Sequence, residues 1–113
     1  MISETIIDYL NSVDELSASA FAEVPEDAPD EYIIVEHIAG SEENHISTTR
    51  LAVQSIAPSL YQAALLNEAV KKAMSGAVSL NEVSSIDLNS DYNFTNTATK
   101  EYRYQAVFDI THY

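Results

Sequence analysis

The sequence lacks cysteine altogether, and its 113 residues include only two glycines and three prolines. Without cysteine there is no disulfide, thiolate nucleophile or cysteine-ligated metal, which suits a chain that folds in a reducing cytoplasm. The two glycines cannot form a phosphate-binding G-x-G-x-x-G or G-x-x-x-x-G-K loop, and no G-x-S-x-G elbow occurs. No spacing singles out a catalytic pair of carboxylates. We therefore predict that the chain is not an enzyme and binds no cofactor.

Positive charge is also scarce. Five Lys and Arg oppose eighteen Asp and Glu, for a formal net charge of −13, and residues 1–49 contain no Lys or Arg. Binding to DNA phosphates requires a basic footprint, so we do not expect a direct grip on DNA. Two interpretations of the acid surplus remain open: it serves solubility, or it forms a purposeful acidic surface.

Long apolar runs are missing too. No run approaches the roughly 18 residues of a membrane span, and the start of the chain has no basic, apolar signal pattern. "DLNSDYN" begins like a calcium loop, but Tyr92 and Ala98 stand where that loop needs Gly and Glu. No two histidines have the H-x-x-x-H spacing of a helical metal site. We expect no membrane segment and no metal.

Helical periodicity occurs in two segments. Its apolar positions are Ile2, Ile6, Leu10 and Val13 in the first segment, and Ala63, Leu66, Val70 and Met74 in the second. Ser3 is the expected N-cap of the first helix. Ser59 and Gln62 form a capping-box pattern before the second helix, and Gly76 is the expected C′ residue after it.

Two-residue alternation predicts the strands. The expected strands are 19–24, 31–39, 46–57, 82–94 and about 100–113. Pro25–Asp30 is expected to be a turn, Gly40–His45 a polar loop and Thr95–Thr99 a turn. The element order α-β-β-β-α-β-β predicts a single α+β domain over residues 1–113. Its antiparallel or mixed β-sheet should carry two helices packed on one face.

Aromatic residues concentrate in the last two expected strands, at Tyr92, Phe94, Tyr102, Tyr104, Phe108 and Tyr113. They could pack across the strands against the helices, or they could lie in a subunit interface, where Tyr is enriched. Both interpretations can hold for different members of the set. The candidate interface residues are Tyr92, Phe94, Arg103 and Tyr113.

The C-terminal half resembles a known family. "TRLAVQSIAPSLYQAALLNEAVKKAM" and "LNSDYNFTNTATKEYRYQAVFDITHY" are similar to the tail terminator (tail-completion, tail-to-head joining) proteins of long-tailed phages of Gram-positive bacteria. The resemblance covers about residues 49–113, and the front half shares only the general plan. It implies an α+β fold and a homo-hexameric ring in the virion, at the head-tail junction. The implied partners are other copies of the chain, the tail tube protein and the head connector, with no activity and no cofactor.

An acidic balance fits such a ring, because a lumen of Asp and Glu repels DNA phosphates as the genome passes through. The candidate acids, on the lumen or on an end face, are Glu26, Asp27, Glu42 and Glu43. Two alternatives remain open. One is a neck or head-completion protein on the connector side, and the other is a small acidic binding module that acts as a monomer.

Overall fold

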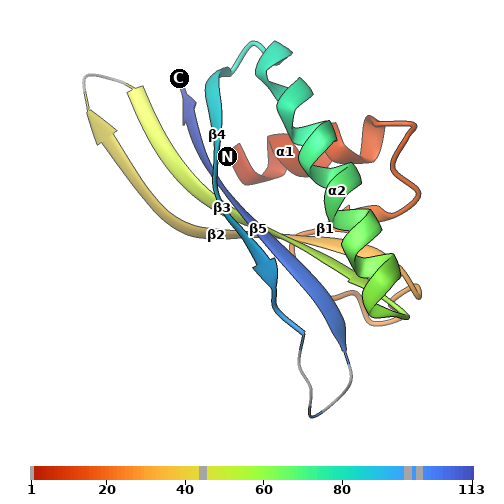
Figure 1. Ribbon diagram of the computed structural model, residues 1–113. Coiled ribbons are helices and arrows are strands. Elements are labelled where there is room, and N and C mark those ends of the chain that lie inside the picture. Colours follow the sequence, from red (N-terminus) through yellow and green to blue (C-terminus); the bar gives the residue numbers. More distant parts are fainter. Residues whose placement is uncertain (1, 44–45, 96–97, 99–100) are drawn as a thin grey trace.

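The computed structural model describes residues 2–43, 46–95, 98 and 101–113. Its elements are α1 (Ile2–Ser12), β1 (Ser19–Phe21), β2 (Tyr32–Glu43), β3 (Ile46–Ala57), α2 (Leu60–Gly76), a 3-10 turn η1 (Ala77–Ser79), β4 (Val83–Asn93) and β5 (Tyr102–His112). The predicted α+β class and element order are confirmed (Figure 1).

The five strands form one mixed sheet in the order β1-β2-β3-β5-β4. The pairs β2–β3, β3–β5 and β4–β5 are antiparallel, whereas β1 is parallel to β2. The predicted turn at Pro25–Asp30 therefore does not close a hairpin. β1 ends at Phe21, and the segment 22–31, whose prolines cannot donate to a sheet ladder, carries the chain back to start β2 in the same direction.

The helix boundaries correct two predictions and confirm one. α1 begins at Ile2, so Ser3 lies inside its first turn and is not the N-cap. Ser59 is the N-cap of α2, because its Oγ accepts a hydrogen bond from the Gln62 backbone N–H at 3.2 Å. Gly76 is the last helical residue, with φ −79°, and the chain continues into η1. It is therefore not a left-handed C′ residue.

Close packing between the two helices explains why position 76 holds a glycine. A Cβ atom at this position would lie 2.7 Å from Oη of Tyr9 on α1. That hydroxyl donates a hydrogen bond of 2.7 Å to the carbonyl of Ala73 on α2. The missing side chain thus lets the two helices approach at this partly buried hydrogen bond.

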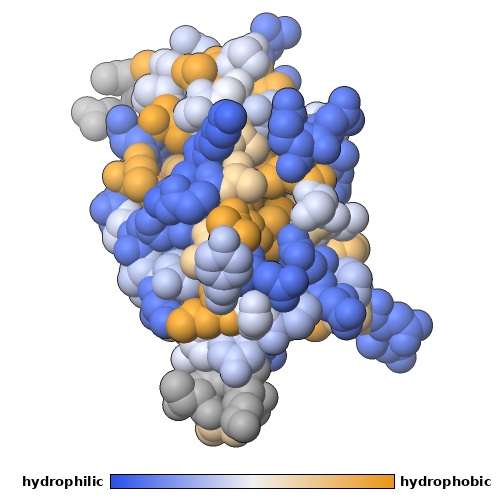
Figure 2. All heavy atoms as spheres, turned by 45° about the vertical axis from the view of Figure 1, so that its right-hand side comes forward, coloured by the Kyte–Doolittle hydropathy of each residue, from blue (hydrophilic) through white to orange (hydrophobic). Residues whose placement is uncertain are grey.

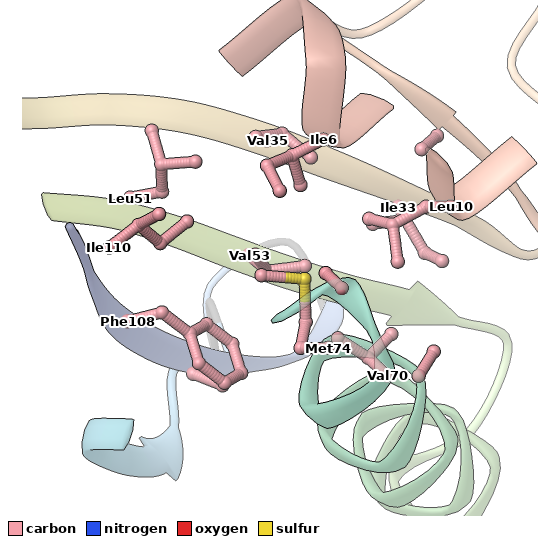
Figure 3. Packing of buried hydrophobic residues seen from close by; sticks show 14 of the residues in the cluster. Ile6, Leu10, Ile33, Val35, Leu51, Val53, Val70, Met74, Phe108 and Ile110 are labelled. Carbon is pink, nitrogen blue, oxygen red and sulfur yellow. The ribbon is translucent and has the colours of Figure 1, made fainter. Parts of the chain in front are cut away.

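Both helices cover the same face of the sheet, as predicted (Figure 1). Ile6 and Leu10 of α1 and Val70 and Met74 of α2 pack onto residues that alternate along the strands (Figure 3). The sheet residues in this core are Ala20, Ile33, Val35, Leu51, Val53, Val83, Ala106, Phe108 and Ile110. We call this the helix-covered face and its opposite the helix-free face. On β5, the core residues Ala106, Phe108 and Ile110 alternate with residues of the helix-free face.

The hairpin of β2 and β3 is longer than expected. Gly40–Glu43 continue the β2 ladder, so the predicted loop Gly40–His45 is wrong up to Glu43, and residues 44–45 lie outside the described residues. Backbone hydrogen bonds need no apolar side chains, and this polar part of the strand is solvated. A β-bulge at Ile38 interrupts the register between His37 and Ala39. The predicted turn Thr95–Thr99 lies largely outside the described residues.

Candidate interaction surfaces

Three of the four candidate interface residues lie together at one end of the β4–β5 ribbon. The rings of Tyr92 and Phe94 meet edge to face, with centroids 5.9 Å apart and planes at 83°. The guanidinium carbon of Arg103 lies 5.9 Å from the Phe94 centroid, within cation–π range. Tyr92 remains 42% exposed and Phe94 47% exposed. We call these three residues the aromatic knob.

The knob is held in place by backbone and side-chain hydrogen bonds. The Phe94 N–H donates to the Arg103 carbonyl at 2.8 Å, and the Arg103 N–H donates to Thr95 Oγ1 at 3.1 Å. Arg103 Nη1 also donates to Gln54 Oε1 on β3 at 2.9 Å, and Nη2 forms an ion pair with Glu101. The exposed rings therefore sit on a fixed ribbon, which lowers the entropy cost of binding a partner.

Tyr113, the fourth candidate, is not part of the knob. Its backbone N–H donates to the Glu82 carbonyl at 3.0 Å, which places it beside the start of β4, and its side chain is exposed. Because β5 runs from Tyr102 to His112, Tyr113 and Arg103 lie at opposite ends of that strand.

A polar row crosses the helix-free face behind the knob. Gln54 Nε2 donates to Gln105 Oε1 at 2.9 Å and to Glu36 Oε2 at 3.4 Å, and Gln105 Nε2 donates to Tyr92 Oη. Gln54 and Gln105 are 6% and 7% exposed, so the strands on either side already desolvate them. These contacts join β2, β3, β5 and β4 and leave the face polar.

A second polar row lies further along the same face. Arg50 Nε donates to Asp109 Oδ1 at 2.8 Å, and Asn89 Nδ2 donates to Asp109 Oδ2 at 3.1 Å. The hydrogen bond from Arg50 lowers the pKa of the Asp109 carboxyl below its ordinary value, and the same contact raises the pKa of Arg50. Asp109 thus remains ionised at neutral pH and links β3, β5 and β4.

The candidate acids fall into two groups at opposite ends of β2. Glu26 and Asp27 are exposed in the segment that precedes the strand, and Glu42 is exposed near its far end. Glu43 belongs to the same end of the strand by its backbone. Since β2 contains 12 residues and a strand rises about 3.3 Å per residue, the two groups belong to different ends of the molecule.

The sequence reasoning missed a groove on the helix side. It runs between α2 and the segment that follows α1, and its first part is lined by Glu15, Ser17, Glu31, Gln62, Leu65, Leu66 and Ala69. A second hollow continues it along Tyr9, Val13, Lys72 and Ala73, and shares Glu15 and Ala69 with the first. In Figure 2, which brings this side forward, apolar atoms gather near the centre between hydrophilic ones. We call this feature the α2 groove.

Two large apolar residues of α2 are exposed. Leu65, which lines the groove, is 51% exposed, and Tyr61, in the first turn of the helix, is 72% exposed. The groove is also lined by two acids, Glu15 and Glu31. The negative charge of Glu15 acts on the neighbouring Tyr9: burial raises the pKa of the Tyr9 hydroxyl, and the charge of Glu15 raises it further. The available signal was in the helix pattern, because Leu65 is a large apolar residue that lies off the predicted stripe.

Both sides of the sheet have strand edges that lack a described neighbour. β1 pairs only with Tyr32–Ile34, so β2 from Val35 onward has no strand on its outer side among the described residues. β4 is the opposite edge along its whole length, and Leu88 is exposed there. Unpaired edges are templates for strand addition by another chain.

Asp91 fixes part of the β4 edge to α2. It accepts hydrogen bonds of 2.6 Å from Asn67 Nδ2 and from Lys71 Nζ. Hydrogen bonds to Asp91 and then to Glu68 raise the pKa of Lys71. The residues that looked like the start of a calcium loop thus make ordinary contacts, with Asp91 on Lys71 and Asn89 on Asp109.

Within the described residues, no group of His, Asp and Glu is arranged to hold a metal ion. None of the described helices is long and apolar enough to cross a membrane. Neither the comparison with known protein families nor the search of curated proteins returned a match for this chain. The surfaces of the molecule and the resemblance of residues 49–113 are therefore the two guides to its function.

Proposed function

We propose that this chain is a tail terminator of a long-tailed phage or prophage of a Gram-positive bacterium. Copies of it would close into a homo-hexameric ring on the head-proximal end of the tail tube, stop tube polymerisation and join the tail to the head connector. The proposal combines the resemblance over residues 49–113 with one structural observation, the two unlike open edges of a single sheet.

The two edges suit a head-to-tail ring. Neighbours in the order β2-β3-β5-β4 are all antiparallel, so β2 and β4 run in opposite directions. Copies in a cyclic ring share one orientation about the axis, so β2 of one copy would lie antiparallel beside β4 of the next. That pairing continues the alternation of the sheet from copy to copy. A ring of this kind uses each edge once.

The charge distribution is compatible with a conduit for DNA. The acids Glu26 and Asp27 lie at one end of β2 and Glu42 lies at the other, so each end of such a ring would present carboxylates. Carboxylates repel the phosphates of a passing genome. The protein in this proposal assembles in the host cytoplasm and contacts DNA only as the DNA passes through the ring.

The test is deletion of the gene from the phage that carries it, with electron microscopy of the resulting tails. Tail termination predicts overlong tails without heads, and a plasmid copy of the gene should restore tails of normal length with heads. Tails of normal length that lack heads would contradict termination and favour the neck alternative.

Purified protein gives an independent check. A terminator should bind assembled tail tubes in the absence of heads and should stop their growth when added during polymerisation. A protein that leaves tube length unchanged and does not sediment with the tubes would contradict the proposal.

A further inference from the structure

α2 has a second row of apolar residues beside the stripe that it buries against the sheet. The buried stripe consists of Ala63, Leu66, Val70 and Met74. Leu65 and Ala69 line the groove, and Tyr61 continues their row one turn earlier. Residues four positions apart lie on one side of a helix, so these three residues share a side. A helix that packs on one layer needs one apolar stripe, so the second row indicates a second packing partner.

The groove beside this row has the length of a short helix. Its two hollows have volumes of about 280 and 380 Å³ and share Glu15 and Ala69, so they form one trough. Its lining residues on α2 extend from Gln62 to Ala73, which at about 1.5 Å per residue is about 16 Å, or about three turns. The opposite wall is the end of α1 and the segment after it. A long trough of this kind suits a row of side chains better than one small molecule.

The charge of the groove selects the occupant. Among the described residues, the first hollow is lined by Glu15 and Glu31 and by no Lys or Arg. Both acids belong to the wall opposite α2, which is built from the half of the chain that has no Lys or Arg. Lys72 lines only the second hollow, and it stands on α2. An occupant therefore meets acids on the side away from α2, and it meets a base only near the end of α2.

We infer that the α2 groove binds an amphipathic helix of another protein, one that carries Lys or Arg along one flank. Apolar residues of that helix, spaced i, i+3, i+4 and i+7, would pack on Leu65 and Ala69. Its basic flank would pair with Glu15 and Glu31. The contact uses neither open edge of the sheet, so it goes beyond the proposed ring and does not depend on it.

The described helices of this chain do not have the required chemistry, which favours another protein over a second copy. α1 contains no Lys or Arg. α2 buries its main apolar stripe against its own sheet, and its Lys71 is already paired with Asp91 and Glu68. Because each copy has a net charge of −13, a basic partner is attracted to the groove where a further copy is repelled.

Two synthetic peptides test the contact in solution. Each is a helix of about 15 residues, long enough for the groove, with Leu on one face. One carries Lys along one flank, and the other carries Glu at the same positions. Fluorescence anisotropy should give a Kd about tenfold lower for the Lys peptide, since two exposed charge pairs differ between the complexes. In ¹H–¹⁵N NMR spectra, the backbone amides shifted by the Lys peptide should belong to residues that line the groove.

Variants of the protein test the apolar contact. Leu65→Ser should raise the Kd of the Lys peptide about tenfold, because it removes the exposed apolar side chain from the groove. Val78→Ser is the matched control, since Val78 is 50% exposed, nearly the same as Leu65, and does not line the groove. It should leave the Kd unchanged.

A second set of variants tests the charge contact. The double variant Glu15→Lys/Glu31→Lys should reverse the preference, so that the Glu peptide binds more tightly than the Lys peptide. The control Glu26→Lys/Glu42→Lys makes the same charge change at exposed residues outside the groove. It should keep the preference for the Lys peptide.

The contrary outcomes are distinct. No binding of the Lys peptide, or equal binding of both peptides, would overturn the inference. Shifts spread over the whole surface, or equal loss in the two control variants, would show unspecific attraction to an acidic protein and would also overturn it. An oligomer of the protein alone that Leu65→Ser dissociates and Val78→Ser does not would assign the groove to a second copy instead. None of these measurements uses tail tubes, so their failure is separate from a failure of the terminator proposal.

Discussion

Ile33 and Ile34 are neighbours on β2, but they belong to different clusters. Ile33 lies in the main core under the two helices, whereas Ile34 packs with Tyr32, Ile56 and Phe21 on the helix-free face. The first face is buried by helices and is apolar along the centres of β2, β3 and β5. The second has no covering layer among the described residues, and polar contacts between strands cross it.

The two faces contribute differently to the fold: the helix-covered face supplies stability, and the helix-free face fixes the register of the strands. Apolar burial under the helices supplies most of the folding free energy, because it removes the largest side chains from water. The polar rows add less free energy, since each bond replaces one to water, but they match only one register of the strands. A face built this way stays wettable.

The largest expected effect comes from a matched pair of substitutions, one on each face of β2. Ile33→Ala should lower the free energy of unfolding toward the upper end of the range of about 2–5 kcal/mol, because the helices enclose the cavity it leaves. Ile34→Ala should cost toward the lower end of that range, since water can reach the smaller cluster. Urea denaturation of both variants measures the difference. Equal costs would mean that the helix-free face is as well packed as the core.

The polar row gives the next effect. Gln105→Leu should cost about 1–3 kcal/mol, because it leaves the amide of Gln54 without its buried partner. The double variant Gln54→Leu/Gln105→Leu should cost less than the sum of the single ones, as no half of the pair is then stranded. The same denaturation measurement applies. Strict additivity would show that the two glutamines do not act as a unit.

The helix side offers a smaller effect at Gly76. In the wild type, Gly76→Ala places a methyl group against Tyr9 Oη and disturbs its bond to Ala73. In a Tyr9→Phe background that conflict is absent, so Ala should stabilise α2 by about 0.5–1 kcal/mol. The double-mutant cycle from thermal or urea denaturation gives the coupling. A gain of the same size in both backgrounds would argue against the close contact.

The smallest effect is the pH dependence from Asp109. Its pKa is lower in the folded protein than the ordinary 3.8 because Arg50 donates to it. Its stabilising contribution is therefore present above about pH 4, and it is lost as the pH falls through the lower folded pKa. Asp109→Asn should remove this part of the acid destabilisation, most clearly at low salt. Unfolding curves that keep the same pH dependence after the substitution would contradict it.

Much of the fold was predictable from periodicity. The stripes of Ile6 and Leu10, and of Val70 and Met74, placed both helices correctly, and two-residue alternation placed the closing strand β5. Polarity misled the prediction at Gly40–Glu43, where the ladder continues without apolar side chains. The parallel pairing of β1 was also missed, because a proline-bearing segment indicates where a strand stops and not which way the next one runs.

The surfaces were predictable only in part. Tyr92, Phe94 and Arg103 form a cluster because the β4–β5 register brings them together. Tyr113 shares only the aromatic character of Tyr92 and Phe94 and lies at the other end of β5. The α2 groove joins residues around Glu15, Glu31 and Leu65, which are far apart in the sequence. Which of these distant segments meet is decided by tertiary packing, and no local pattern records it.

The bulge at Ile38 decides which way the acids of the long hairpin project. With one extra residue in β2, Gly40 and Glu42 take the side of the strand that His37 occupies, and all three border one hollow with Thr49 and His112. An uninterrupted strand would have turned Glu42 to the opposite side. Deleting Ile38 would therefore move the Glu42 side chain to the other face of the β2–β3 hairpin without changing any carboxylate. The single bulge residue thus determines which face of the hairpin carries this charge.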